Sequence, residues 1–174
     1  SSDLKQIDTE RVGMLGHSMG GGVTLSALLA RPDLIDAAVF FAPVSGDARL
    51  NYKKWTESNS SRAAAIKAAY GSPEENPEFW DGISAINYLD RIAVPVMIHH
   101  GTADDSVPVE WSEDLDTRLQ AAGKDTILHI YKVLGLGGLA FRPTSRAPWA
   151  GRPCRLSPGA GRPAASPGQP TGTA

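Results

Sequence analysis

A serine set among glycines, in the stretch VGMLGHSMGGG at residues 12–22, is the first candidate for chemistry in this sequence. The spacing Gly16-x-Ser18-x-Gly20 follows a short apolar run and precedes a segment with helical periodicity, which is the context of a nucleophile elbow. In such a turn the serine backbone is strained, and the positions two before and two after it must be small. The hydroxyl then projects above a sheet edge, where the N–H of Met19 is a donor for an oxyanion. The pattern therefore predicts Ser18 as a nucleophile in acyl transfer.

Other interpretations of the glycine-rich stretch have to be weighed. A glycine-rich turn in which Ser18 caps a helix is the structural alternative. A phosphate-binding loop of the form GxxxxGK[ST] needs a lysine after its last glycine, and Val23-Thr24 stands there instead. The spacing GxGxxG is not matched either.

A serine nucleophile needs a base, and the base needs an orienting carboxylate. The stretch MIHHGTADDSVPVEWS at residues 97–112 offers Asp104 and Asp105 directly after an apolar run. A carboxylate there would lie at the same C-terminal sheet edge as the elbow. The alternative is that both are surface turn residues, since aspartate is common in turns.

The elements that must position these residues follow from hydrophobic periodicity. Four apolar runs predict strands at Val12–Leu15, Asp36–Phe41, Val94–His100 and Thr126–Tyr131. Helices are expected over Gly20–Ala30 and Pro108–Ala122. Two or three more are expected in residues 44–92, which would form a helical cap insertion. Its Trp55 and Trp80 are candidates to line a pocket or to pack in the core. Apolar strands alternating with helices indicate an α/β fold with a mostly parallel sheet and helices on both faces.

The elbow and the segment SAINYLDRIAVPVMIHHGTADDSVPVEWSEDL resemble α/β-hydrolases of the prolyl-oligopeptidase and dienelactone-hydrolase type, over about residues 8–131. The family reads His-Gly-x-x-Asp-x-x-Val-Pro after its strand, and the matching residues are His100, Gly101, Asp104, Val107 and Pro108. The resemblance implies a partial α/β-hydrolase domain, with Asp104 rather than Asp105 as the acid. It implies a serine hydrolase that cleaves a small-molecule ester or a peptide through an acyl-enzyme on Ser18, with neither cofactor nor metal required. The elbow GHSMGG is closer to esterase-like members than to the peptidases.

The base is what the resemblance leaves unassigned. In the family the catalytic histidine follows the last strand in a short glycine-rich loop, whereas here no histidine follows His129. His129 lies inside a predicted strand, where a core or edge position is expected, and His17 is expected to point away from the nucleophile. His99 and His100 are adjacent in a strand, so they face opposite sides and cannot chelate a metal together. We therefore expect no catalytic histidine, no metal site and, because the family's second oxyanion donor precedes the elbow strand, an incomplete oxyanion hole.

Composition divides the chain into residues 1–132, expected to fold, and residues 133–174. All 19 acidic residues precede residue 133, and the last part has eight glycines and seven prolines but no Lys, Asp or Glu. That composition predicts a disordered tail. Its richness in Arg, Pro, Gly and Ala, which have GC-rich codons, suggests an out-of-frame reading that begins where the family places its histidine loop. A natural disordered extension is the alternative.

The bulk properties narrow the function. A net charge of −2 gives no indication of a nucleic-acid or membrane partner, and no apolar run is long enough to span a bilayer. No signal peptide is visible, although a chain that begins with Ser1 is typical of a fragment. The single cysteine, Cys154, excludes an internal disulfide and favours a reducing compartment such as the cytoplasm.

Two other functions compete with an active hydrolase. One is a non-catalytic hydrolase fragment, because the base and an oxyanion donor are not found. The other is an acyltransferase, since those enzymes also use a Gly-His-Ser-x-Gly elbow. The His-Gly-x-x-Asp-x-x-Val-Pro stretch favours the hydrolase over the acyltransferase.

Overall fold

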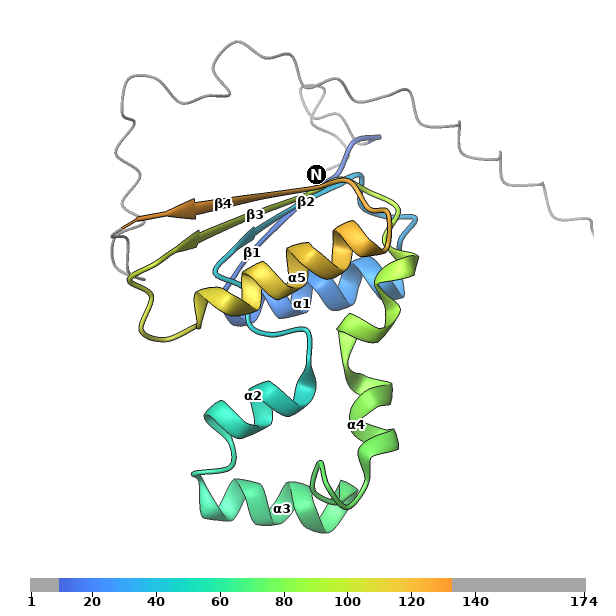
Figure 1. Ribbon diagram of the computed structural model, residues 1–174. Coiled ribbons are helices and arrows are strands. Elements are labelled where there is room, and N and C mark those ends of the chain that lie inside the picture. Colours follow the sequence, from blue (N-terminus) through green and yellow to red (C-terminus); the bar gives the residue numbers. More distant parts are fainter. Residues whose placement is uncertain (1–9, 133–174) are drawn as a thin grey trace, which may run out of the picture. The chain divides into compact units, whose positions relative to one another are not determined.

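A four-stranded parallel sheet is the framework of the computed structural model, which describes residues 10–132 (Figure 1). The sheet order β1-β2-β3-β4 follows the sequence, and every pair is parallel. The strands are β1 (Gly13–His17), β2 (Ala37–Phe41), β3 (Val96–Gly101) and β4 (Thr126–Tyr131). The expected α/β class and all four expected strands are therefore confirmed. The tail predicted for residues 133–174 lies outside the described residues.

Two helices, α1 (Met19–Ala30) and α5 (Val109–Ala121), pack on one face of this sheet. Each presents leucines three or four residues apart, which lie on one side of a helix. The short 3₁₀ helix η1 (Ala85–Arg91) closes the same layer. The core consists of Leu25, Leu28, Ile35, Ala38, Phe40, Leu89, Ile92, Val96, Ile98, Leu115 and Leu119.

The other face of the sheet carries no helix among residues 10–132 (Figure 1). Its side chains lie in rows set by the strand register, and one row is Leu15, Val39, Met97 and Ile127. Leu15 is 64% exposed and Ile127 49% exposed. The expectation of helices on both faces thus holds for one face only in the described part of the chain. We call the other the open face.

The helical insertion, residues 44–92, contains α2 (Ala48–Trp55), α3 (Ser60–Tyr70) and α4 (Pro77–Ile83) before η1. These three helices lie beyond α1 and α5 as seen from the sheet (Figure 1). Each begins at a residue whose side chain accepts a hydrogen bond from a first-turn N–H; the caps are Asp47, Asn59 and Asn76. The expectation of two or three helices in this segment is confirmed.

A polar clasp joins the two ends of the helical insertion. The hydroxyl of Ser84, which is buried, accepts from Ala48 N at 3.0 Å and donates to Trp80 O at 2.7 Å.

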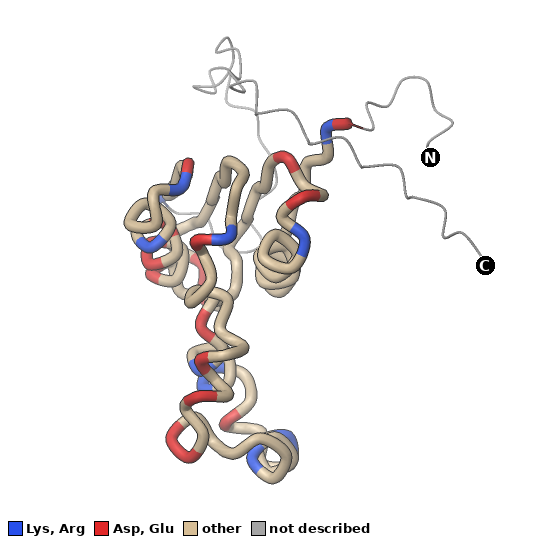
Figure 2. Tube along the Cα trace, turned by 90° about the vertical axis from the view of Figure 1, so that its right-hand side faces the viewer, with Lys and Arg blue, Asp and Glu red and all other residues tan. Residues whose placement is uncertain are grey.

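Charged residues of both signs are spread over the insertion and the sheet layer (Figure 2). None of the helices between residues 10 and 132 has the length and apolar character needed to cross a membrane.

Candidate active site

Ser18 occupies a sharp turn between β1 and α1. Its backbone has φ 52° and ψ −120°, a conformation that L-residues rarely adopt and that costs about 1–3 kcal/mol. The serine makes no side-chain cap to the helix, so its hydroxyl is not used as an N-cap. This geometry is that of a nucleophile elbow rather than of a capped turn.

The glycines around Ser18 have different roles. A Cβ atom at Gly16 would stand 2.4 Å from Gly20 O and 2.5 Å from Thr24 Oγ1, so any side chain there collides with the start of α1. At Gly21 a Cβ would meet Pro43 Cβ at 2.6 Å. At Gly20, by contrast, a Cβ meets nothing within 4 Å among the described residues. A small residue was expected two positions before and two positions after the serine. Among the described residues, the packing requires it at Gly16, before the serine, and not at Gly20, after it.

The segment after β2 braces the elbow, a role that sequence reasoning missed. Ser18 N donates to Phe41 O at 2.9 Å, and Val44 N donates to Ser18 O at 3.1 Å. Ala42 between them has φ 42°, and its N–H donates to His99 O at 2.8 Å. The sequence shows only the pair Ala42-Pro43 after the second apolar run, which does not indicate a contact with the elbow.

Asp104 lies in the loop between β3 and α5. Its Oδ1 accepts from Ser106 N at 3.0 Å and Val107 N at 2.9 Å, and its side chain is only 2% exposed. Asp105 is exposed. The structure thus separates two aspartates that are adjacent in sequence, and only Asp104 has the fixed carboxylate that an orienting acid needs.

His100 holds the loop that carries Asp104. Its ring is fully buried, with Nε2 3.0 Å from Val107 O and Nδ1 2.7 Å from Ser112 Oγ. A carbonyl can only accept, so Nε2 donates and Nδ1 accepts from the serine hydroxyl. Asp104 Oδ2 is 3.6 Å from the same Nε2. His100 is therefore a structural residue of this loop.

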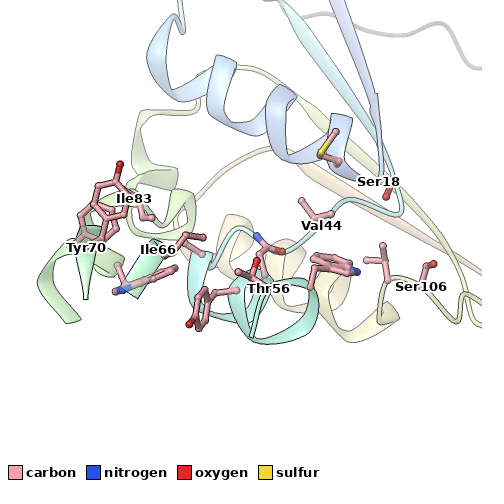
Figure 3. Close-up of a pocket in the computed structure, with 15 residues that line it drawn as sticks. Ser18, Val44, Thr56, Ile66, Tyr70, Ile83 and Ser106 are labelled. Carbon is pink, nitrogen blue, oxygen red and sulfur yellow. The ribbon is translucent and has the colours of Figure 1, made fainter. Parts of the chain in front are cut away.

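Ser18 and the Asp104 loop open onto one cavity of about 650 Å³ (Figure 3). Ser18 and Met19 line one side, Ser106 and Val107 another, and the helical insertion supplies the rest. The contribution of the insertion is mainly aromatic and aliphatic: Val44, Ala48, Tyr52, Trp55, Ile66, Tyr70, Phe79, Trp80 and Ile83. Asn51 and Thr56 complete the lining, which contains no acidic or basic side chain from the part of the chain that the structure describes. Trp55 and Trp80 both line the cavity, and Trp80 is also buried at 4% exposure.

The remaining sequence-predicted groups are placed as follows. Met19 N is the first N–H of α1, a position that has no acceptor within its own helix. None of the four histidines lines the cavity. His129 lies in β4, the edge strand of the described sheet, and His17 ends β1. Between residues 10 and 132 no group of three or more His, Cys, Asp or Glu residues could hold a metal ion.

His99 lies in an environment that lowers its pKa. Burial lowers its pKa to about 4, with a smaller contribution from the charge of His129. Its ring stacks between those of Phe41 at 4.7 Å and His129 at 5.0 Å on the open face. His99 is therefore neutral at physiological pH and lies on the opposite side of β3 from His100.

A parallel sheet whose first described strand leads through a strained serine into a helix defines the class of α/β-hydrolases. Within that class the chain belongs to the prolyl oligopeptidase family, peptidase family S9, whose sequence profile matches residues 2–136.

Known proteins with similar sequences and structures support this membership. Dipeptidyl peptidase 4 of Sus scrofa is 29% identical over 125 residues, which are 71% of this chain and 15% of that protein. Bis(hydroxyethyl) terephthalate hydrolase of Streptomyces coelicolor is 46% identical over 57 residues, 33% of this chain and 16% of that protein. The crystal structure of Pyrococcus horikoshii acylaminoacyl peptidase matches with a TM-score of 0.60 and 26% identity, over 76% of this chain and 21% of that one. The chain thus spans about a fifth or less of the length of each.

Proposed function

We propose that this chain carries the nucleophile and the acid of a serine hydrolase that cleaves a peptide or ester bond. The observation that carries the proposal is the strained Ser18, which opens onto a cavity also lined by the loop of Asp104. Ser18 Oγ would attack the substrate carbonyl and lose its proton to a base, while Met19 N–H stabilises the oxyanion. The base would then protonate the leaving amine or alcohol, and water would release the acid from the serine. Asp104 would orient the base.

The cavity indicates what the substrate presents to Ser18. Its lining is aromatic and aliphatic and has no charged side chain, so a neutral apolar group is favoured over an ionised one. Two relatives are named as peptidases and one as a bis(hydroxyethyl) terephthalate hydrolase, so the proposal includes both a peptide and an ester bond. A pair of substrates with one aromatic acyl group, a p-nitroanilide and a p-nitrophenyl ester, separates peptidase from esterase activity.

The lack of an identified catalytic base limits the activity that we expect. None of the four histidines lines the cavity, and the sequence has no histidine after His129. We therefore propose that the chain hydrolyses its substrate poorly, because Ser18 has no general base beside it. The competing proposal is a non-catalytic fragment in which Ser18 is not reactive at all.

Labelling with a fluorophosphonate, read by intact mass, tests the proposal. We expect slow labelling of the 174-residue chain, loss of the adduct in Ser18→Ala, and faster labelling when free imidazole replaces the base. If imidazole accelerates the labelling of the parent chain and not of Ser18→Ala, the group that the parent chain lacks is a general base. A folded protein that stays unlabelled at all imidazole concentrations would favour the non-catalytic fragment.

The domain organisation is a proposal as well: a partial hydrolase domain in residues 1–132, with 133–174 an out-of-frame tail. Reading the coding DNA downstream of the Lys132 codon in all three frames tests it. A frame that encodes a glycine-rich loop with a histidine supports it. If only the present frame is open, the tail belongs to the protein.

A further inference from the structure

His99 and His129 are partners across two strands of the open face. They are directly paired in the register of β3 and β4, so their side chains leave the sheet on the same side. Their ring centroids are 5.0 Å apart and the ring planes differ by 16°. His100, the sequence neighbour of His99, faces the other side of the strand, and the pair across the two strands is not predicted from the sequence.

Tyr131 adds a third group to the same face. Its hydroxyl is 2.8 Å from His99 Nδ1, and its ring lies 5.8 Å from that of His99. When His99 carries its proton on Nδ1, it donates to the tyrosine oxygen, and Nε2 keeps its lone pair. No other hydrogen bond from the described residues engages the ring nitrogens of His99 or His129.

We propose that His99 and His129 form a two-histidine site for a divalent late transition-metal ion, such as Ni²⁺, Cu²⁺ or Zn²⁺. Imidazole nitrogen is a preferred ligand of these ions, with bonds of about 2.0–2.1 Å to zinc. The torsion between Cβ and an imidazole ring is soft, so the His129 ring can rotate to turn a nitrogen toward the Nε2 side of His99, whose Nδ1 stays on the Tyr131 hydroxyl. Water would complete the coordination, and Tyr131 would hold the outer nitrogen of His99 as a positioning residue.

The surroundings of the pair restrict how its rings can move. Phe41 packs against the far side of the His99 ring and restricts its position. With two histidines and no carboxylate or thiolate in the set, the affinity should be moderate, in the micromolar to sub-millimolar range, and Ca²⁺ and Mg²⁺ should not bind.

Isothermal titration of the untagged 174-residue chain with NiCl₂ tests the site, independently of any hydrolase activity. We expect one ion per chain. His99→Phe and His129→Phe keep an aromatic ring in the stack and remove the ligand nitrogen. Each should weaken binding at least about tenfold, because even the loss of an outer-shell partner costs about 10–100-fold.

His17→Ala is the matched control. His17 is in the same register row on the open face but is separated from His99 by Phe41 of the intervening strand. Its loss should leave Ni²⁺ affinity unchanged, and circular dichroism should show that all three variants fold. Absence of Ni²⁺ binding by the unmutated chain at millimolar concentration, or unchanged affinity in His129→Phe, would overturn the proposal.

Discussion

The loop of Ser18 and the loop of Asp104 are positioned by different forces, although they open onto the same cavity. The Ser18 turn is held by close packing of backbone: a strained φ, a glycine with no room for a Cβ, and the segment after β2 pressed against α1. The Asp104 loop is held by hydrogen bonds: the carboxylate accepts from two loop N–H groups, and the buried imidazole of His100 donates to Val107 O.

This difference explains why each loop has its own sequence signature. Steric constraint is recorded in the sequence as glycine, because glycine alone lacks the atom that would collide. Hydrogen-bonded constraint is recorded as polar residues at fixed spacing, here His100, Asp104 and the Ser112 that completes the network. The Ser18 turn should therefore be sensitive to added volume, and the Asp104 loop to lost hydrogen bonds.

The largest effect is expected from adding one methyl group beside the nucleophile. Gly16→Ala places a Cβ 2.4 Å from Gly20 O, which is backbone and cannot move aside alone. The free energy of unfolding should fall by at least about 3 kcal/mol, measured by urea denaturation. Gly20→Ala is the matched control: its Cβ has free space in the described part of the chain, and alanine is favoured in a helix by about 1 kcal/mol. Equal destabilisation by both substitutions would show that packing does not distinguish them.

His100→Leu should give the next largest effect. This substitution replaces the imidazole by an apolar side chain of moderate volume. It leaves Val107 O and Ser112 Oγ without their buried partner. We expect a loss of about 2–3 kcal/mol in the free energy of unfolding. The exposed His17→Ala should change it by less than about 0.5 kcal/mol. A variant as stable as the parent would mean that the loop does not depend on the imidazole.

Asp104→Ala should cost less, because its hydrogen bonds lie near the surface of the loop. Two bonds to Ser106 N and Val107 N are lost, which predicts a decrease of about 1–2 kcal/mol. Asp105→Ala, which changes the exposed neighbour, should stay within about 0.5 kcal/mol of the parent. If the two substitutions had the same effect, the assignment of Asp104 as the fixed carboxylate would be wrong.

Local pattern was enough to predict the sheet layer. Each strand is a continuous apolar run, which is the pattern of a parallel sheet whose two faces are both covered. The elbow was equally readable, since the strained φ of Ser18 demands Gly16 at a fixed distance. The Asp104 assignment needed the spacing from His100 as well, because nothing local separates Asp104 from Asp105.

Contacts between distant segments were not readable from one sequence. The brace that Pro43 forms against Gly21 joins residues of different elements, and periodicity does not record which elements meet. The pairing of His99 with His129 depends on strand register, because a shift of one residue would place the two side chains on opposite faces of the sheet. The open face was missed for a related reason: apolar strands predict that both faces are covered, but not by which part of a protein.

The smallest effect concerns His99, which shares β3 with His100 but lies on the open face and does not support the acid loop. Its pKa is about 4 in the folded chain and near 6.5 when unfolded, so between these values the unfolded state binds more protons. The free energy of unfolding should therefore fall as the pH is lowered from about 6.5 to about 4, modestly because the ring is partly exposed to solvent. Urea denaturation at several pH values, with His99→Phe as the reference, isolates this contribution. The parent should lose stability relative to the variant in that range, and identical pH dependence would contradict the lowered pKa.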